Sequence, residues 1–411
     1  MLDVPLVILA AGSSSRFFPL ASNYHKGFYT VLGKSLAEHT LLSAYNAGVR
    51  TAFAIVSPHD SVANSNQVFA NLPKDFKVEV VVQPAPLGMG DALLQLQTQL
   101  PKHFFVASPY HVTCGSILQL LYKKQQATEC SCVLAGEQTL HPERYGIIEY
   151  SGDKVTAVIE KPKLSETTSS MKISSVYLLS SAYLQKLSKT EQSEYNFELA
   201  LNTHAKEANI CWVENTQNLP TLKYAWHLLT LMQTLLSTQT AKQAPTAKIA
   251  KTAVLDESNG PIVIADNAEV RDFVKILGPA YIGENTLVGE YSFIRQSSLE
   301  SGARVGAYTE VVRSLICPDA TVHQSYIADS ILGPKTKVGA GFITANKRFD
   351  RKIIEPMVKG AAVSSSTKAL GVITGNTVTL GIQVAAMPGT LIGSNNIIYP
   401  QTVVSGTKEH V

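Results

Sequence analysis

A short loop near the N-terminus combines small residues with a basic side chain. The apolar run at residues 6–10 leads directly into Ala11-Gly12-Ser13-Ser14-Ser15-Arg16. A turn of such small residues exposes backbone N–H groups that can bind phosphate oxygens, and the guanidinium of Arg16 adds positive charge. An ordinary strand-to-helix connection has the same local composition, so the loop alone is weak evidence for a phosphate site.

The cysteines offer little chemistry of their own. They number five, an odd count, and are scattered along the chain: Cys114, Cys130, Cys132, Cys211 and Cys317. This usage favours reduced thiols in a cytoplasmic protein over a disulfide framework. Cys130 and Cys132 form the only close pair, and a metal site would need further ligands at suitable spacing. We therefore predict core or surface thiols.

Charge and hydropathy exclude two classes of partner. The formal net charge of the 411 residues is +3, and the longest Lys/Arg run is a pair, so we expect no nucleic-acid partner. No apolar run reaches the roughly 18 residues of a membrane span, and the N-terminus lacks the charged start of a signal peptide. We expect a cytoplasmic protein without a membrane partner.

The elements that must position the loop alternate over the first 235 residues or so. Short apolar runs such as LVILA, TAFAIV and KVEVVV alternate with longer amphipathic stretches such as SLAEHTLLSAYNAGV. This alternation predicts an α/β domain with a mostly parallel sheet and helices on both faces. Ligands of such sheets bind beyond the carboxyl ends of the strands, which is where the loop lies.

The pattern changes at about residue 262. Aliphatic residues then recur every six positions, as in Ile264, Val270, Ile276, Ile282, Val288 and Ile294. A sustained period of six predicts a β-solenoid whose inward side chains stack coil upon coil. Between the two patterns, Pro245 should end a preceding helix near Gln243. We predict an α/β domain at 1–240 including the connecting helix, a linker at 241–260 and a β-helix at 261–411.

An ordered series of motifs in the first domain resembles the signature of sugar-1-phosphate nucleotidyltransferases. LAAGSSSR, then Lys26 and VLGKS, are followed by a Gln83…Leu87-Gly88-Met89-Gly90 segment, by Tyr145-Gly146 and by Glu160-Lys161-Pro162. The resemblance implies a Rossmann-like, glycosyltransferase-A-like fold. It also implies that nucleotide and sugar phosphate are bound by Leu9, Ala10, Ala11, Gly12, Arg16, Lys26, Gln83, Gly88, Gly146 and Glu160.

The second domain resembles the left-handed parallel β-helix of hexapeptide repeats in the bifunctional enzymes that make UDP-N-acetylglucosamine, in particular the archaeal type. The likeness rests on SLESGARVGAYTEV, HQSYIADSILG and VGAGFITANKRFD. It implies that His323 is the base that deprotonates an amine attacking acetyl-CoA. It further implies a substrate site for an amino-sugar phosphate at Arg295, Tyr326, Asn346 and Lys352, and assembly as a homotrimer or hexamer.

The first domain departs from that family at its metal site. Where the family has an Asp that holds Mg²⁺, after the run HFFVAS, this chain has Pro109-Tyr110, and His25 replaces a Pro before Lys26. A phenol does not replace an aspartate as a Mg²⁺ ligand at neutral pH. The sequence leaves open whether His111 or Asp91 supplies a ligand instead, and hence whether Mg²⁺ is used.

Together these patterns predict a transferase of sugar-nucleotide biosynthesis. The resemblance implies acetyl transfer from acetyl-CoA to an amino-sugar-1-phosphate by the β-helix. The first domain would convert a nucleoside triphosphate and a sugar-1-phosphate into a nucleotide sugar and pyrophosphate, of uridylyl or thymidylyl type, with activity reduced by the substitution at Tyr110. Two alternatives stay open: a non-catalytic regulatory or scaffold subunit of a sugar-nucleotide pyrophosphorylase, and an active nucleotidyltransferase whose tail only oligomerises.

Overall fold

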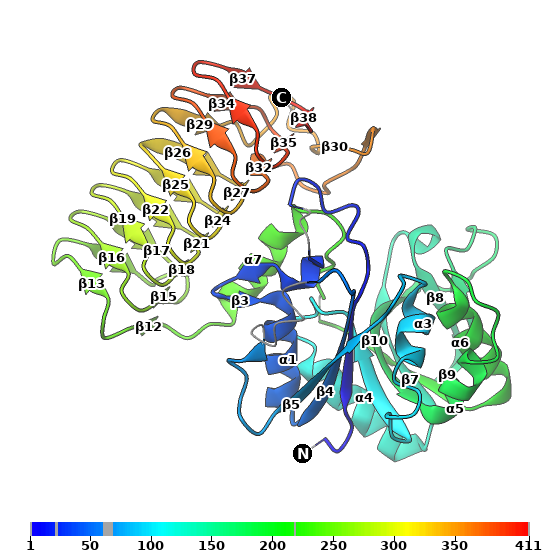
Figure 1. Ribbon diagram of the computed structural model, residues 1–411. Helices are drawn as coiled ribbons and strands as arrows, with labels where there is room; N and C mark the ends of the chain where they lie inside the picture. The colour runs from blue at the N-terminus through cyan, green and yellow to red at the C-terminus, as the bar shows by residue number, and fades with distance from the viewer. Residues whose placement is uncertain (1, 21–23, 61–68, 218, 410–411) are drawn as a thin grey trace. The chain divides into compact units, whose positions relative to one another are not determined.

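The computed structural model describes residues 2–20, 24–60, 69–217 and 219–409 (Figure 1). Its contacts divide the chain into two compact units. The head unit contains Met1–Ser13, Asn23–Tyr29 and Ser35–Thr221, and the β-helix unit contains Leu222–Val411 together with Ser14–Ser22 and Thr30–Lys34. Each unit is described separately below.

The head unit is built on one nine-stranded sheet of order β5-β4-β1-β6-β10-β7-β11-β9-β8. Strands β5, β4, β1 and β6 are parallel, as the alternating pattern predicts, whereas β10 is antiparallel to both β6 and β7. The strands are β1 (Leu6–Ala10), β4 (Thr51–Val56), β5 (Lys77–Val82), β6 (His103–Ala107), β7 (Cys132–Gln138), β8 (Gly146–Ser151), β9 (Lys154–Glu160), β10 (Met171–Ser180) and β11 (Ile210–Glu214).

Helices cover both faces of this sheet, because successive residues of each strand point to opposite sides. Leu6 and Ile8 of β1 belong to one core with α1 and α4, while Val7 belongs to a second core with α3, α5 and α6. The helices of the head are α1 (Leu36–Ala47), α3 (Met89–Leu94), α4 (Gly115–Thr128), α5 (Ser181–Leu187) and α6 (Asn196–Glu207). The predicted α/β fold is thus confirmed.

The β-helix unit consists of three parallel sheets of short strands, one sheet for each side of the coils. Two of the sheets run from β12 (Lys242–Gln243) to β38 (Thr407–Lys408) and from β13 (Lys248–Ile249) to β36 (Ile397–Ile398). The third sheet carries the candidate site and contains β14 (Val254–Asp256), β17 (Lys275–Leu277), β20 (Phe293–Arg295), β23 (Glu310–Val312), β26 (Ser325–Ala328), β29 (Phe342–Thr344), β34 (Ala385–Ala386) and β37 (Val403–Val404).

The period of six residues arises from the interior of these coils. The aliphatic residues that recur at this interval, among them Ile264, Val270 and Ile276, are fully or almost fully buried in one continuous core. Each coil pairs in parallel with the next, so that Val311 lies beside Ile327. The expected β-helix is therefore confirmed.

The structure differs from the sequence prediction at the start of the β-helix. Helix α7 (His227–Ser237) ends six residues before the predicted Gln243. Residues 241–260, which the sequence assigned to a linker, instead contain β12, β13 (Lys248–Ile249) and β14, which pair with the following coil. Lysines and threonines are frequent in this coil and obscured its inward residues Ile249 and Leu255, which are themselves six positions apart.

One long excursion interrupts the coils between β29 and β32 (Val372–Thr374). It leaves at Asn346 and returns at Leu370, whose N–H donates to the Asn346 carbonyl oxygen at 2.9 Å. Within it, β30 (Met357–Val358) and β31 (Ala361–Ala362) form a small antiparallel hairpin. The excursion holds the segment Arg351-Lys352, so one of the predicted substrate-binding residues lies outside the coils.

The cysteines correct one prediction. Cys130 and Cys211 are joined by a disulfide, with Cα atoms 5.9 Å apart, whereas reduced thiols were predicted. The parallel pairing of β11 with β7 places Cys211 beside Val133 and so brings together two cysteines that are distant in sequence. Cys114, Cys132 and Cys317 are buried and form no disulfide with the described residues. Among the described helices, none is long and apolar enough to cross a membrane.

Candidate functional site

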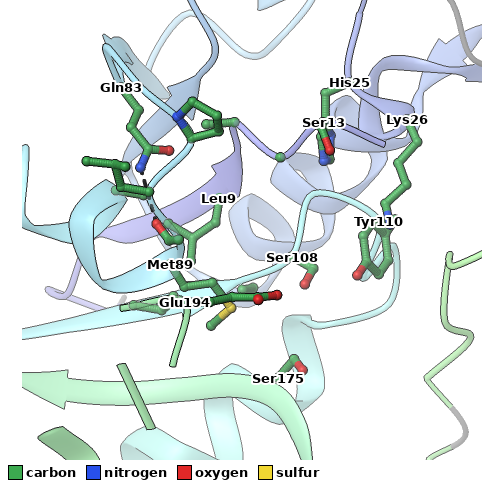
Figure 2. A pocket seen from close by; sticks show the side chains of 18 of the residues that line it. Leu9, Ser13, His25, Lys26, Gln83, Met89, Ser108, Tyr110, Ser175 and Glu194 are labelled. Atoms are coloured by element: carbon green, nitrogen blue, oxygen red, sulfur yellow. Dashed lines mark hydrogen bonds between the residues drawn. The ribbon is translucent and has the colours of Figure 1, made fainter. Parts of the chain in front are cut away.

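The head unit contains a cavity of about 650 Å³ beyond the carboxyl ends of β1 and β6. Figure 2 shows side chains from the two strand ends and from the opposite wall lining this space. Of the residues predicted to bind nucleotide or sugar phosphate, Leu9, Ala11, Gly12, Lys26, Gln83 and Gly88 line it. The topology thus brings together residues that are distant in sequence, as expected for a sheet of this kind.

Four predicted residues have other places in the structure. Ala10 is buried in the core, and Arg16 lies on the segment that groups with the β-helix unit. Gly146 and Glu160 face each other on β8 and β9, where a Cβ on Gly146 would come within 2.8 Å of Glu160 Oε2. These two residues are not among those that line the cavity.

Tyr110, at the position where the resemblance implies a metal-binding Asp, contacts Lys26. The Lys26 ammonium lies 5.1 Å from the centroid of the Tyr110 ring (Figure 2). A cation at this distance over an aromatic face is stabilised by about 0.5 to 2 kcal/mol, depending on desolvation. The ring therefore orients the lysine within the cavity, and both side chains line the same wall.

Among the described residues that line the cavity, Glu194 is the one carboxylate, so a Mg²⁺ site there would have a single such ligand (Figure 2). Mg²⁺ requires oxygen ligands, usually carboxylates, but the Asp91 Oδ2 accepts a hydrogen bond of 2.7 Å from Gln83 Nε2. His111 is buried, and burial lowers the pKa of its imidazole to about 4. Across the residues that the structure describes, no group of three or more His, Cys, Asp and Glu side chains could hold a metal ion.

His25 supplies a donor that the sequence did not predict. Its backbone N–H donates to Asp60 Oδ1 and its Nδ1 accepts from the Gly27 N–H, each at 3.0 Å. Burial and the neighbouring Lys26 lower the pKa of His25 to about 3, so the ring is neutral at pH 7. With Nδ1 accepting, the ring proton lies on Nε2, the nitrogen nearest to Gly12. A neutral N–H donor therefore adjoins the glycine-containing loop.

Gln83 is held in one orientation by its neighbours. It is buried, and its Nε2 donates to Asp91 Oδ2 at 2.7 Å and to the Gly88 carbonyl oxygen at 3.2 Å. These two acceptors occupy both amide protons, so only Oε1 remains to interact with a ligand. The Gln83 side chain therefore presents an acceptor to the cavity.

In the β-helix unit, the predicted substrate residues lie on neighbouring coils of one sheet. Tyr326 of β26 pairs with Glu310 of β23, and Arg295 of β20 pairs with Val312 of β23. His323 is an exposed residue in the turn between β25 (Thr321–Val322) and β26. Asn346 follows β29, which pairs with β26 through Tyr326 and Ile343. Arg295 and Tyr326 thus lie in, and His323 and Asn346 close to, the consecutive strands β20, β23, β26 and β29, although the four residues are separated by up to 51 positions in the sequence.

Arg295 and Glu310 form an ion pair on this sheet. Arg295 Nη2 lies 3.1 Å from Glu310 Oε1, and both side chains are about one-third exposed. The Arg295 Nε is buried and makes no hydrogen bond with the described residues. Val311 and Val312, which follow Glu310, are buried. Arg295 is thus a partly exposed basic group held on these coils by Glu310.

The buried carboxylate of Asp329, which the sequence motifs did not identify, is hydrogen-bonded to both Arg313 and Asn346. Asp329 Oδ1 accepts from Arg313 Nε at 2.6 Å, and its Oδ2 accepts from Arg313 Nη2 at 2.7 Å and from Asn346 Nδ2 at 2.5 Å. These hydrogen bonds raise the pKa of Arg313. The sequence feature that could have revealed this pair is the length of the coil. Arg313 and Asp329 are 16 residues apart, as are the paired residues Val311 and Ile327.

The two units define a class of protein: an α/β sheet with a ligand cavity at its strand ends, followed by a parallel β-helix. The model of the nucleotidyl transferase family matches residues 6–227, and the chain belongs to this family. A UDP-glucose pyrophosphorylase from Acinetobacter baumannii has a similar fold, with a TM-score of 0.50 and 16% identity over 56% of this chain and 92% of that one.

Similarity to curated proteins extends along both units. The chain is 27% identical to the bifunctional sugar-1-phosphate nucleotidylyltransferase/acetyltransferase of Sulfurisphaera tokodaii, over 97% of this chain and 96% of that protein. It is 29% identical to the bifunctional protein GlmU of Methanococcus maripaludis, over 95% and 92%. The uncharacterised acetyltransferase YaiX of Escherichia coli is 32% identical over 46% of this chain and 85% of its own length.

Proposed function

We propose that the β-helix unit transfers an acetyl group from acetyl-CoA to the amine of an amino-sugar-1-phosphate. The observation that carries the proposal is the placement of Arg295, Tyr326 and Asn346 on neighbouring coils of one sheet, next to the exposed His323. The bifunctional relatives, which are named for both transfer activities, support the same assignment.

In this reaction the amine nitrogen attacks the thioester carbonyl carbon. The new C–N bond forms as the C–S bond breaks and the thiolate leaves. His323 accepts the proton that the amine loses and returns it to the departing thiolate. Arg295 binds the sugar phosphate through charge-assisted hydrogen bonds, while Tyr326 and Lys352 offer further polar contacts to the substrate.

For the head unit we propose binding of nucleotide and sugar phosphates with weak nucleotidyl transfer. Lys26, the loop at Gly12 and the neutral Nε2–H of His25 can stabilise phosphate oxygens. The Oε1 of Gln83 is suited to a base that presents an N–H donor, as uracil, thymine and guanine do. The cation–π contact between Lys26 and Tyr110, in place of a metal carboxylate, supports weak turnover.

The same substitution favours a second candidate, a regulatory subunit whose head senses a nucleotide sugar. A single assay separates these possibilities. The purified chain is incubated with acetyl-CoA, glucosamine-1-phosphate, UTP and Mg²⁺, and the release of CoA thiol and of pyrophosphate is followed in parallel. We expect thiol release with little pyrophosphate, whereas release of neither product would favour the regulatory subunit.

A further inference from the structure

Asp329 occupies the base of the long excursion of the β-helix. The residue is buried, with 6% of its surface exposed, and lies directly after β26. Its carboxylate accepts from Asn346, where the excursion leaves the coils, and its carbonyl oxygen accepts from Gly371, where the chain returns, at 2.8 Å. One residue therefore contacts both ends of the segment that begins with a predicted substrate ligand.

The chemistry of this contact fixes which end of the Asn346 amide faces Asp329. An ionised carboxylate only accepts hydrogen bonds, so the amide must turn its nitrogen toward it and its oxygen away. The Asn346 Nδ2 lies 2.5 Å from Asp329 Oδ2 accordingly. The Asn346 Oδ1 makes no hydrogen bond among the described residues, and the side chain is partly exposed. The amide oxygen is thus an oriented and unused acceptor.

Arg313 keeps the carboxylate in this role. Its guanidinium binds both Asp329 oxygens, and a bidentate pair of this kind has one preferred geometry. The positive charge also offsets the cost of burying the carboxylate charge. The pair with Arg313 therefore holds in place the carboxylate oxygen that the Asn346 amide nitrogen contacts.

We propose that Asp329 is a positioning residue that directs the Asn346 Oδ1 toward the amine of the sugar substrate and thereby selects an amino sugar over its hydroxyl analogue; the inference rests on the acetyltransferase function proposed above. An ammonium group has three donors and no acceptor, so it can pair with Oδ1 but not with an amide nitrogen. A hydroxyl group both donates and accepts, so it tolerates either amide orientation.

The test is a binding titration of the full-length protein by calorimetry, with glucosamine-1-phosphate and glucose-1-phosphate as the two probes. We expect the unmodified protein to bind the amino sugar about tenfold or more tightly, as for a hydrogen bond to a charged group. Asp329→Asn should lose this preference and keep its affinity for glucose-1-phosphate. The matched control Asp272→Asn removes an Asp on another β-helix corner, hydrogen-bonded to Thr252, and should keep the preference.

A second variant covers the case in which Asp329→Asn does not fold. Asn346→Ala leaves Asp329 paired with Arg313 and should lose the preference for the amino sugar to the same extent. Adding Asp329→Asn to Asn346→Ala should change this preference no further. Equal weakening of both ligands by Asp329→Asn, or an unmodified protein that binds the two ligands equally or not at all, overturns the inference. If the unmodified protein prefers glucosamine-1-phosphate but transfers no acetyl group, only the proposed catalytic function is contradicted.

Discussion

The Lys26 ammonium lies 5.1 Å from the centroid of the Tyr110 ring, within the wall of the head cavity. The aromatic ring thus orients the Lys26 ammonium at the position where the resemblance to the family implies a metal carboxylate. We therefore expect the head to bind phosphate but to hold Mg²⁺ weakly, since Glu194 is the one carboxylate among the described residues that line the cavity.

Replacing Tyr110 by Asp should supply a further carboxylate. We expect Tyr110→Asp to raise Mg²⁺-dependent pyrophosphate release from UTP and a sugar-1-phosphate by roughly tenfold or more, because a hard oxygen ligand stabilises the transferring phosphate through the ion. Tyr110→Asn is the control, since it has the same size as the Asp variant without the charge. Rapid Mg²⁺-dependent release by the unmodified protein would show that Tyr110 does not limit the head.

Glu198 of α6 should make the stability of the head depend on pH. Burial raises the pKa of this carboxyl from 4.5 to about 7, so the folded state binds the proton more tightly than the unfolded state does. Its contribution to stability is therefore most favourable below pH 4.5 and is lost as the pH rises through 7. Glu198→Gln should raise the free energy of unfolding at pH 8 by on the order of 1 to 3 kcal/mol and flatten this dependence.

The measurement for Glu198 is urea unfolding at pH 5 and pH 8. Glu191→Gln is the matched control, because Glu191 is exposed and its removal should leave the difference between the two pH values unchanged. If Glu198→Gln destabilises the protein equally at both pH values, the carboxyl acts through a hydrogen bond or packing contact rather than through its ionisation.

Arg295 should act on substrate binding rather than on the chemical step. We expect Arg295→Ala to raise the KM for the phosphorylated amino sugar by roughly tenfold or more with a small change in kcat, because the phosphate is remote from the reacting amine. Steady-state kinetics of thiol release provide the measurement. Arg271→Ala is the control, since Arg271 also pairs with a Glu on the β-helix, at 2.8 Å. A fall in kcat alone would place Arg295 in the chemistry.

The β-helix unit should assemble the protein into a trimer or a dimer of trimers. Several large apolar side chains on its coils are more than half exposed, namely Ile343, Ile382, Ile397, Tyr399 and Val403. Large exposed apolar side chains are frequent in interfaces, and side-by-side packing of identical coils would bury them symmetrically. Sedimentation of the full-length protein at micromolar concentration checks this, and a monomer would contradict it.

The sequence predicts the repeating parts of this protein better than its local contacts. The period of six through Ile264, Val270 and Ile276 indicates the β-helix because every coil must bury the same inward positions. The contact of Lys26 with Tyr110 and the disulfide of Cys130 with Cys211 depend on which strands are neighbours in the sheet, and no local pattern encodes that order.

In the candidate site, too, the sequence identifies residues within motifs but not the contacts between them. His323, Tyr326 and Asn346 were identified from motifs, whereas Asp329 was not, although it stands in the same motif as His323. Its role follows from the 16-residue coil that places it beside Arg313 and from the excursion that begins at Asn346. A buried charge network is a property of the tertiary structure, so the spacing of charges along the chain becomes informative only once the coil length is known.

The most direct test of the account is the rate of CoA-thiol release by the purified protein with acetyl-CoA and glucosamine-1-phosphate, compared with that of His323→Ala. We expect steady turnover by the unmodified protein and a loss of about 10²- to 10⁴-fold in the variant, the usual effect of removing a positioned general base. Unchanged sedimentation and thermal unfolding of the variant would show that the fold is intact. Equal turnover by the two proteins, or no thiol release by the unmodified protein with either glucosamine-1-phosphate or galactosamine-1-phosphate, would contradict the proposed acetyltransferase.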